Sequence, residues 1–491
     1  MQATNFQSSR AAYVVGSTQY DPEELLRFAT EHVMATGAEP TPQNVAEAIN
    51  LIYREDGFAL AETRYRIDGN TGDVVFLVAE GVIADVRIEG FGPSTSSRIG
   101  AYVQGLFGRS PLRQADLERA IMLASDLAGV SLVSEVVPSG QTAQGSTLRI
   151  AGRETHQSGA IGIDVVPIRP GTAVRGFVVQ ELYGVANGGD LLRLVGQATL
   201  DRGDDWSVSG VAFYRAPVGG DGTYVEMLGG NTVARRDFAN VTSDSKLTGW
   251  NAAFVVAHPV LRDAHNFGYL MAEYEFTDAR SRFLGRRLNS TSHAIRLRGI
   301  YGSDFANGGI LRAALSISAG ARPTTSPGNL PDGAENFAHV RSEVGLALPI
   351  GRSKATSLRL EWRGQWASAR LPEVERFTIG HAPFLRGYAP AEVEGDRGWS
   401  ATAELNRSID VKDKTLLNIV PLVFASIGHT DILQPRPFDQ DDQTLASVGT
   451  GAEFHLSGQV KISSWVAVPL RDGPQSRAGN PAFHIGIVKG W

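Results

Sequence analysis

From residue 160 to the end of the chain, apolar and polar residues alternate in one segment after another. The clearest segment is residues 357–366, SLRLEWRGQW, in which leucine and tryptophan take one set of positions and mostly charged residues take the other. Successive side chains of a β-strand point to opposite faces, so this pattern predicts strands with one apolar and one polar face. The alternation recurs in residues 268–276, 295–301 and 340–348. The last two thirds of the chain are therefore expected to be all β.

Turn residues divide this region into about sixteen predicted strands. They are placed at residues 159–167, 171–182, 189–201, 204–216, 221–230, 246–260, 265–278, 290–302, 308–321, 337–350, 354–368, 398–409, 414–427, 444–456, 459–468 and 481–490. An even strand number of this size is typical of single-chain bacterial membrane barrels.

A soluble sandwich or solenoid would produce alternation as well as a membrane barrel. Strands in soluble sheets are commonly about 5–6 residues long, whereas many strands predicted here approach the roughly 9–11 residues of a tilted membrane span. Aromatic residues recur at several segment ends, as in the interfacial girdles of membrane proteins. We therefore favour an all-β transmembrane barrel of about 16 antiparallel strands over residues 155–491. The residues expected to face its wet lumen include Arg296, Arg298, Arg341, Glu343, Arg359, Glu361 and Arg363.

The first 154 residues show helical periodicity and divide into two α+β modules of similar order. In residues 1–81, a strand at 13–15 is followed by helices that begin after Asp21 and Thr41, and then by strands at 61–67 and 73–79. In residues 82–154, a strand at 83–89 is followed by a helix from Ser97, a helix at 114–128 and a hairpin. This order resembles POTRA domains, the periplasmic modules in front of certain outer-membrane barrels. On these residues alone, two unrelated small α/β domains remain an alternative.

Composition removes several kinds of function. The chain has 491 residues, no cysteine and a net charge of −6, which leaves no thiol chemistry and no basic surface for nucleic acid. The sequence contains no apolar run of about 18 residues, the length that a transmembrane helix needs. There is no HExxH zinc motif, phosphate-binding loop or GxSxG nucleophile, so we expect no enzyme activity, no metal site and no cofactor. Met1 precedes a polar run, as expected of a mature chain whose export signal has been removed.

A long loop rich in glycine and proline separates the eleventh and twelfth predicted strands, at residues 369–397. Loops of this length are usually functional or disordered, and the apolar content of this one argues against a solvated tail. Its candidate site residues are the tip Phe384, Leu385, Arg386, Gly387 and Tyr388, followed by Gly395, Asp396 and Gly398. An arginine inside a barrel needs a carboxylate or water, because an unpaired buried charge is costly.

The series Glu375-Arg376-Phe377, Gly380, 384–388, 395–398 and Glu404-Leu405 resembles the signature of TpsB transporters, which export haemolysins and filamentous adhesins in two-partner secretion. The turns at 187–190 and 214–222 are also similar to that family. The resemblance implies a sixteen-stranded barrel, two POTRA domains, and a sixth extracellular loop that folds into the lumen. It covers most of the chain.

The resemblance also implies that Arg386 pairs with an acidic residue on a following strand. Relatives usually carry an aspartate on the thirteenth strand, where this chain has Ser426. We therefore expect Glu404, on the neighbouring strand, to be the partner of Arg386. The alternative is that Arg386 only pins the loop during assembly. A long amphipathic helix of the kind that plugs some relatives is not evident, so the loop alone is expected to occlude the pore, wholly or in part.

Three functions are weighed on this basis. The favoured one is a Gram-negative outer-membrane pore whose periplasmic POTRA domains recognise an unfolded, secreted, TpsA-like β-helical client and pass it through the barrel. The second is an outer-membrane protein insertase of the same superfamily, and the third is a soluble β-rich binding protein. The expected partners are the client and outer-membrane lipid but not nucleic acid, and a monomer is the working assumption.

Overall fold

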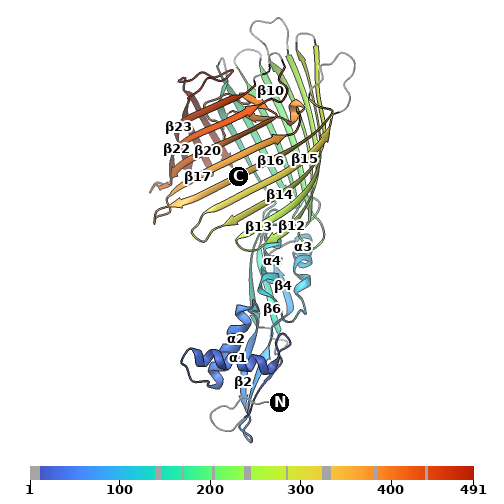
Figure 1. The fold of residues 1–491 in the computed structure, drawn as a ribbon, viewed down its shortest axis with the longest axis vertical. Coiled ribbons are helices and arrows are strands. Elements are labelled where there is room, and N and C mark those ends of the chain that lie inside the picture. The colour runs from blue at the N-terminus through green and yellow to red at the C-terminus, as the bar shows by residue number, and fades with distance from the viewer. Residues whose placement is uncertain are drawn as a thin grey trace. The chain divides into compact units, whose positions relative to one another are not determined.

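The computed structural model describes residues 11–138, 145–168, 171–201, 205–236, 245–283, 286–322, 333–380, 384–436, 439 and 441–491. The chain folds into two compact units. The first comprises Met1–Glu154 together with Asn187–Gly189 and Gly219–Asp221, and the second comprises the rest of the chain. In Figure 1 the first unit begins in blue, and the second ends in red at the C-terminus.

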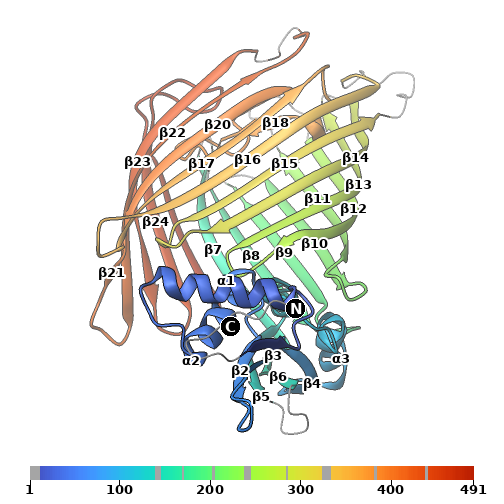
Figure 2. The same ribbon diagram turned by 60° about the horizontal axis from the view of Figure 1, so that its bottom comes forward.

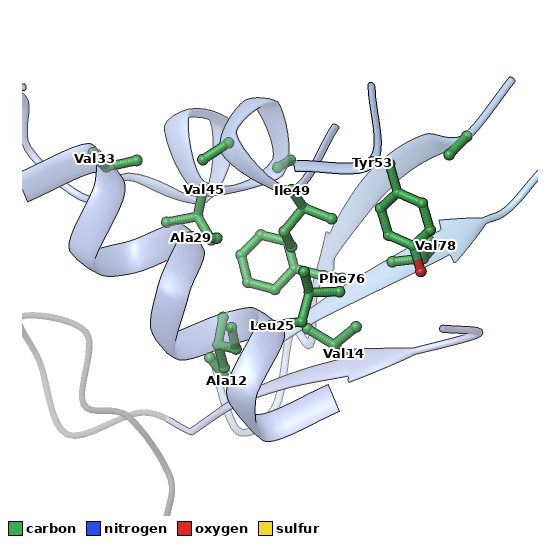
Figure 3. Close-up of a cluster of buried hydrophobic side chains, with 14 of the residues drawn as sticks. Ala12, Val14, Leu25, Ala29, Val33, Val45, Ile49, Tyr53, Phe76 and Val78 are labelled. Carbon is green, nitrogen blue, oxygen red and sulfur yellow. The ribbon is translucent and has the colours of Figure 1, made fainter. Parts of the chain in front are cut away.

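The first module is a three-stranded sheet with two helices on one face. Its elements are β1 (Ala12–Val15), α1 (Pro22–Ala35), α2 (Pro42–Glu55), β2 (Glu62–Ile67) and β3 (Val74–Ala79), and the strand order is β1-β3-β2. Both helices begin with a capped first turn: Asp21 accepts hydrogen bonds from two backbone N–H groups of α1, and Thr41 accepts one from α2. Leu25, Ile49 and Phe76 meet in the buried core between helices and sheet (Figure 3).

The second module repeats this order of elements. It contains β4 (Val82–Glu89), α3 (Pro93–Val103), η1 (Gln104–Leu106), α4 (Gln114–Ser125), β5 (Val130–Pro138) and β6 (Gly145–Glu154), with strand order β4-β6-β5. The sequence places the start of its first helix too late. The helix begins at Pro93 rather than Ser97, because proline at the first helical position replaces the missing polar N-cap as the start signal. The second helix ends at Ser125, before the predicted Ala128.

The second unit is a closed antiparallel barrel of sixteen long strands (Figures 1 and 2). They are β7 (Gln157–Ile168), β8 (Gly171–Tyr183), β9 (Leu191–Leu200), β10 (Trp206–Pro217), β11 (Tyr224–Arg236), β12 (Ser245–Arg262), β13 (Asn266–Phe283), β14 (Arg286–Asp304), β15 (Ile310–Ala321), β16 (Asn336–Ile350), β17 (Thr356–Ala367), β20 (Arg397–Arg407), β22 (Leu416–Asp431), β23 (Gln443–Leu456), β24 (Val460–Pro469) and β25 (Ala482–Gly490). The two-residue β21 (Ile409–Asp410) pairs with β22 beside the end of β20. The barrel closes where β25 pairs with β7, which excludes the two-sheet sandwich.

The two faces of the wall have opposite character. On β14, Ile295 and Leu297 are each 62% exposed, whereas Arg296 between them is only 8% exposed. Apolar side chains therefore point outward and charged ones inward, the reverse of a soluble protein and the pattern of a wall that faces lipid. In the described part of the chain, no helix has the length and apolar content needed to cross a membrane.

Candidate functional site

The candidate site is the loop that joins β17 to β20. It contains η2 (Glu373–Glu375) and a two-stranded hairpin of β18 (Phe377–Ile379) and β19 (Val393–Gly395). Residues 381–383, which include His381, lie outside the described residues. The loop contacts inward-facing residues of strands as far apart as β14 and β24, so it runs across the interior of the barrel.

An apolar cluster holds the middle of the loop against the wall. Its buried members are Phe377, Ile379, Leu385, Tyr388 and Val393 of the loop and Leu445 of β23. Their burial accounts for the apolar composition of a segment that has little regular structure. The loop is therefore part of the packed interior.

The guanidinium of Arg386 lies between two neighbouring strands of the wall. Its Nη1 donates a hydrogen bond to Oε2 of Glu404 on β20, at 2.7 Å. The guanidinium also lies 4.4 Å from the ring centre of Phe424 on β22, which is directly opposite Glu404 in the strand register. The hydroxyl of Ser426 lies 3.0 Å from the hydroxyl of Thr402. The Arg386 side chain is thus held by both an ion pair and a cation–π contact.

The two residues after Arg386 fix the turn at the tip. Gly387 has φ of 99°, and a Cβ at this position would come within 3.2 Å of Ala467 on β24. Glycine avoids both the strain of this backbone conformation and the close contact. The fully buried Tyr388 places its hydroxyl 2.8 Å from the carbonyl oxygen of Ala446 and 2.9 Å from that of Arg471. Phe384, the first residue of the tip, has the guanidinium of Arg363 at 3.8 Å from its ring centre.

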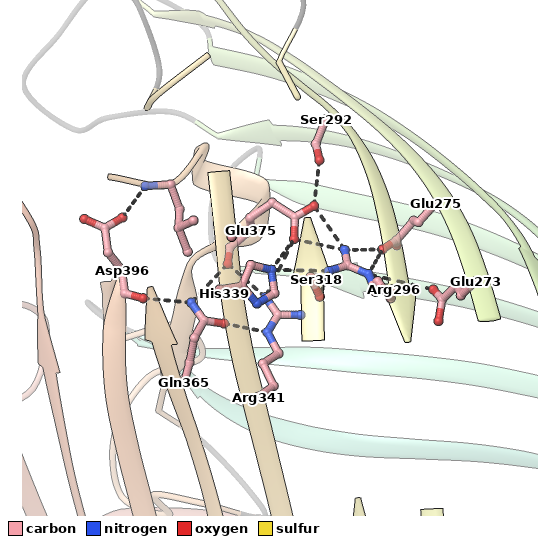
Figure 4. A network of polar contacts seen from close by, with 12 residues as sticks. Glu273, Glu275, Ser292, Arg296, Ser318, His339, Arg341, Gln365, Glu375 and Asp396 are labelled. Atoms are coloured by element: carbon pink, nitrogen blue, oxygen red, sulfur yellow. Dashed lines mark hydrogen bonds and ion pairs between the residues drawn. The ribbon is translucent and has the colours of Figure 1, made fainter. Parts of the chain in front are cut away.

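The root of the loop is held by a second charged centre, drawn in Figure 4. The Glu375 carboxylate is 2% exposed and accepts hydrogen bonds from Arg296 Nη2 at 2.9 and 3.0 Å and from Ser292 Oγ at 2.6 Å. Nε2 of His339 lies 3.1 Å from the same carboxylate. Arg341 donates to the backbone carbonyl of Glu375 at 2.8 Å. This centre joins the loop to β14 and β16.

The electrostatics of this centre keep Glu375 ionised. Burial alone would raise the pKa of its carboxyl, because desolvation disfavours the charged form. The hydrogen bond with His339, the charge of Arg296 and the bond from Ser292 outweigh burial and lower the pKa from 4.5 to about 2. The carboxylate is therefore a permanent anion at ordinary pH.

The end of the loop is closed by Asp396, which is fully buried. One carboxylate oxygen accepts from the N–H of Leu371 at 2.8 Å, and the other accepts from the N–H of Leu433 at 2.7 Å. Burial, the largest influence, raises the pKa of Asp396. The glycines on either side permit close packing: a Cβ at Gly395 would lie 2.6 Å from the carbonyl oxygen of Asp431, and one at Gly398 would lie 2.6 Å from the Phe377 ring.

Two of the remaining lumen-facing candidates form longer ion pairs. Arg298 lies 3.7 Å from Glu343, and Arg359 lies 3.5 Å from Glu404. Arg363 donates to the carbonyl of Thr378 in the loop at 2.5 Å. Glu361 lines a hollow together with Arg298 and Phe384.

Sequence reasoning assigned no contact to several residues that hold the loop, although it included Glu375 in the TpsB signature. They are Ser292, His339 and Glu375 at the root, and Glu392 near the tip. Glu392 accepts from the N–H groups of Gln475 and Ser476 at 2.7 Å each. The available signal for Glu375 and Glu392 was an acidic side chain close to apolar residues, but other charged residues in the loop share that signal.

The contacts of the site attach the loop to the wall. Among the residues that the structure describes, no three His, Cys, Asp or Glu side chains are grouped so that they could hold a metal ion. The interactions at both the tip and the root are ion pairs and hydrogen bonds between the loop and the wall.

A match over the middle of the chain shows the family to which it belongs. Residues 173–454, more than half of the 491 residues, match the model of the haemolysin secretion/activation proteins ShlB/FhaC/HecB. The chain belongs to this family. As a ShlB/FhaC/HecB protein it is a two-partner secretion translocator of the Gram-negative outer membrane, and its partner is a secreted protein. No curated protein matches its sequence.

Solved structures share the fold at low sequence identity. CdiB from Acinetobacter baumannii is 14% identical with a TM-score of 0.74, covering 98% of this chain and 89% of CdiB. CdiB from Escherichia coli is 15% identical with a TM-score of 0.75, covering 100% of this chain and 93% of that one. BamA from Haemophilus ducreyi lacking POTRA domains 1–3 is 15% identical with a TM-score of 0.57, covering 97% of this chain and 99% of that one.

Proposed function

We propose that loop 369–397 is the gate of the secretion pore and that an unfolded client passes through the barrel when this loop leaves the lumen. The observation that carries this proposal is the attachment of the loop by charged contacts at its root and tip, Glu375–Arg296 and Arg386–Glu404. Charged groups released from such contacts can be solvated in a wet lumen, which lowers the cost of breaking them. The mixed charges of Glu273, Arg298 and Arg341 line a hollow on the inner wall.

The two N-terminal modules, residues 1–81 and 82–154, are proposed to be periplasmic POTRA domains that bind the client by strand addition. The second module supplies a suitable edge. Its β5 has nine residues, lies at the edge of the sheet and carries Val133 at 71% exposure. A long unprotected edge strand invites pairing with another chain. An extended client segment would add to β5 through backbone hydrogen bonds.

A charge placed on this edge should block export. We expect Val133→Arg to lower the amount of secreted partner in the medium about tenfold, as loss of about 1.4 kcal/mol of client binding would do. The matched control is Val15→Arg, the same change at an exposed valine of the edge strand β1 in the first module. The measurement is export of the secreted partner into the medium, with the two proteins expressed together in a Gram-negative host.

Equal export by Val133→Arg and the unaltered protein would contradict binding at β5. If Val15→Arg alone reduced export, the docking edge would lie in the first module. An insertase would be recognised by a different readout, a fall in the amount of other outer-membrane barrels while the secreted partner is unaffected.

The client is proposed to be a TpsA-like protein that folds into a β-helix outside the cell, and this folding would draw the chain outward. A barrel closed by a single chain supports a monomeric pore, and its exposed apolar outer face supports contact with outer-membrane lipid.

The gate should resist moderate acid and open only at much lower pH. A carboxyl with a depressed folded pKa contributes stability that is present above its unfolded pKa and is lost as pH falls through the folded pKa. For Glu375 these values are 4.5 and about 2. Bilayer conductance of the full chain should therefore be equal at about pH 7 and about pH 5, and rise below about pH 4. Glu375→Gln should lack this acid step, and a step centred near pH 6 in both proteins would contradict the role of Glu375.

A further inference from the structure

The outer face of the barrel is hollowed across the line where its last strand meets its first. The hollow has a volume of about 680 Å³ and belongs to β25 and β7–β10. Its outward-facing lining consists of Ile161, Ile163, Gly176, Val178, Gly196, Ala198, Val208, Ile487 and Lys489. The exposed surface within it is almost entirely apolar.

The strand register explains why the wall is thin here. Ile487, Ile163, Gly176, Ala198 and Val208 are successive direct partners on five adjacent strands, so they form one row on one face. In the middle of this row, Gly176 has no side chain and Ala198 has only a methyl group. A Cβ at Gly176 would meet no atom within 4 Å, which means that the missing side chain is not replaced by a neighbour.

The adjacent row ends in a positive charge. Lys489, Ile161, Val178 and Gly196 are successive partners in the same way. Lys489 is exposed, and its ammonium group donates to the carbonyl of Gly458 in the turn between β23 and β24. An ammonium group has three donors, so this contact leaves further donors for a ligand.

An aromatic residue marks the same end of the barrel as an interface. Trp491 exchanges two backbone hydrogen bonds with Gly159 at the start of β7, at 3.2 and 3.1 Å, and its indole covers the position where a Gly159 side chain would lie. Tryptophan and lysine are the residues that anchor membrane proteins at the boundary between hydrocarbon and headgroups. The apolar hollow therefore begins at headgroup level and extends into the hydrocarbon.

We propose that this hollow is a binding site for an anionic phospholipid, with one acyl chain along the row over Gly176 and the phosphate at Lys489. A void beside lipid would lose dispersion contacts on every side, and a flexible acyl chain can fill it. Long basic side chains at a membrane boundary attract anionic headgroups. The bound lipid would contact both β25 and β7 and so span the closure of the barrel. This role is separate from export.

The test fills the hollow without disturbing the wall. Full-length protein is stripped of lipid in detergent and titrated with dioleoyl phosphatidylglycerol, and the bound lipid is counted by native mass spectrometry. Gly176→Leu should weaken binding at least about tenfold. The control is Gly229→Leu on β11, an exposed glycine on the same outward face as the 53% exposed Met227, where a Cβ would also meet nothing within 4 Å. This control should bind as the unaltered protein does.

A second variant tests the headgroup contact independently. The unaltered protein should prefer dioleoyl phosphatidylglycerol to dioleoyl phosphatidylcholine, and Lys489→Gln should remove that preference while both lipids still bind. Retained binding in Gly176→Leu, or equal loss in Gly229→Leu, would overturn the acyl site. No preference for the anionic lipid in the unaltered protein would overturn the assignment of its ligand. Heat-dependent migration on gels verifies that each variant has a folded barrel.

Discussion

Glu375→Ala is expected to free the root of the lumen loop and raise the conductance of the pore. The substitution leaves the buried guanidinium of Arg296 without its loop partner and removes the acceptor of Ser292. Breaking a buried ion pair from one side typically costs about 3–5 kcal/mol. Arg296 keeps Glu275 at 2.5 Å, which favours the lower end of that range. A cost of about 3 kcal/mol raises the population of the displaced loop on the order of 100-fold.

Two measurements on the full chain separate loop release from general damage. Backbone hydrogen exchange should accelerate in residues 373–379 but not in the wall strands, and planar-bilayer recordings should show longer open times. The matched control is Glu343→Ala, which also removes a lumen carboxylate beside an arginine. Its partner Arg298 is 3.7 Å away and Glu343 is 59% exposed, so the expected cost is about 0–1 kcal/mol. Equal effects of the two variants would remove the special role of the root.

The strands of the barrel could be predicted from the sequence because their signal is local. A wall with lipid outside and water inside imposes a period of two on every strand, and Leu358, Leu360 and Trp362 display it within five residues. The turn residues then locate most strand ends, although β11 and β13 continue to Arg236 and Phe283, beyond the predicted ends at 230 and 278. The first helix of the second module was harder, since Gly92 makes no side-chain cap and only Pro93 marks its start.

The charged centre at the root could not be predicted in the same way. Ser292 and Glu375 are 83 residues apart, and Arg296 and Glu375 are 79 residues apart. Which inward residue of β14 meets the loop depends on the stagger of neighbouring strands around the barrel, and alternation carries no information about that stagger. Glu404 was easier to propose as a partner because β20 directly follows the loop in the chain.

Arg386→Ala should separate a gating role of the loop tip from a role confined to assembly. The change removes the hydrogen bond to Glu404 and the stacking on Phe424, and a charge-assisted hydrogen bond contributes about 1.5–3 kcal/mol. If the tip is part of the gate, single-channel open probability should rise on the order of tenfold. If Arg386 acts only during assembly, the yield of folded barrel should fall while each folded pore conducts as before.

The matched control is Arg359→Ala, because Arg359 approaches the same carboxylate from β17 at 3.5 Å but is 51% exposed and belongs to the wall. It should leave the open probability unchanged. Arg386→Lys keeps the charge but loses the planar group that stacks on Phe424, so an intermediate effect is expected. A double-mutant cycle of Arg386→Ala with Glu404→Gln should give a coupling energy of about 1.5–3 kcal/mol. Additive effects would mean that the two side chains act separately, and the tip would then be held by Leu385 and Tyr388 in the apolar cluster.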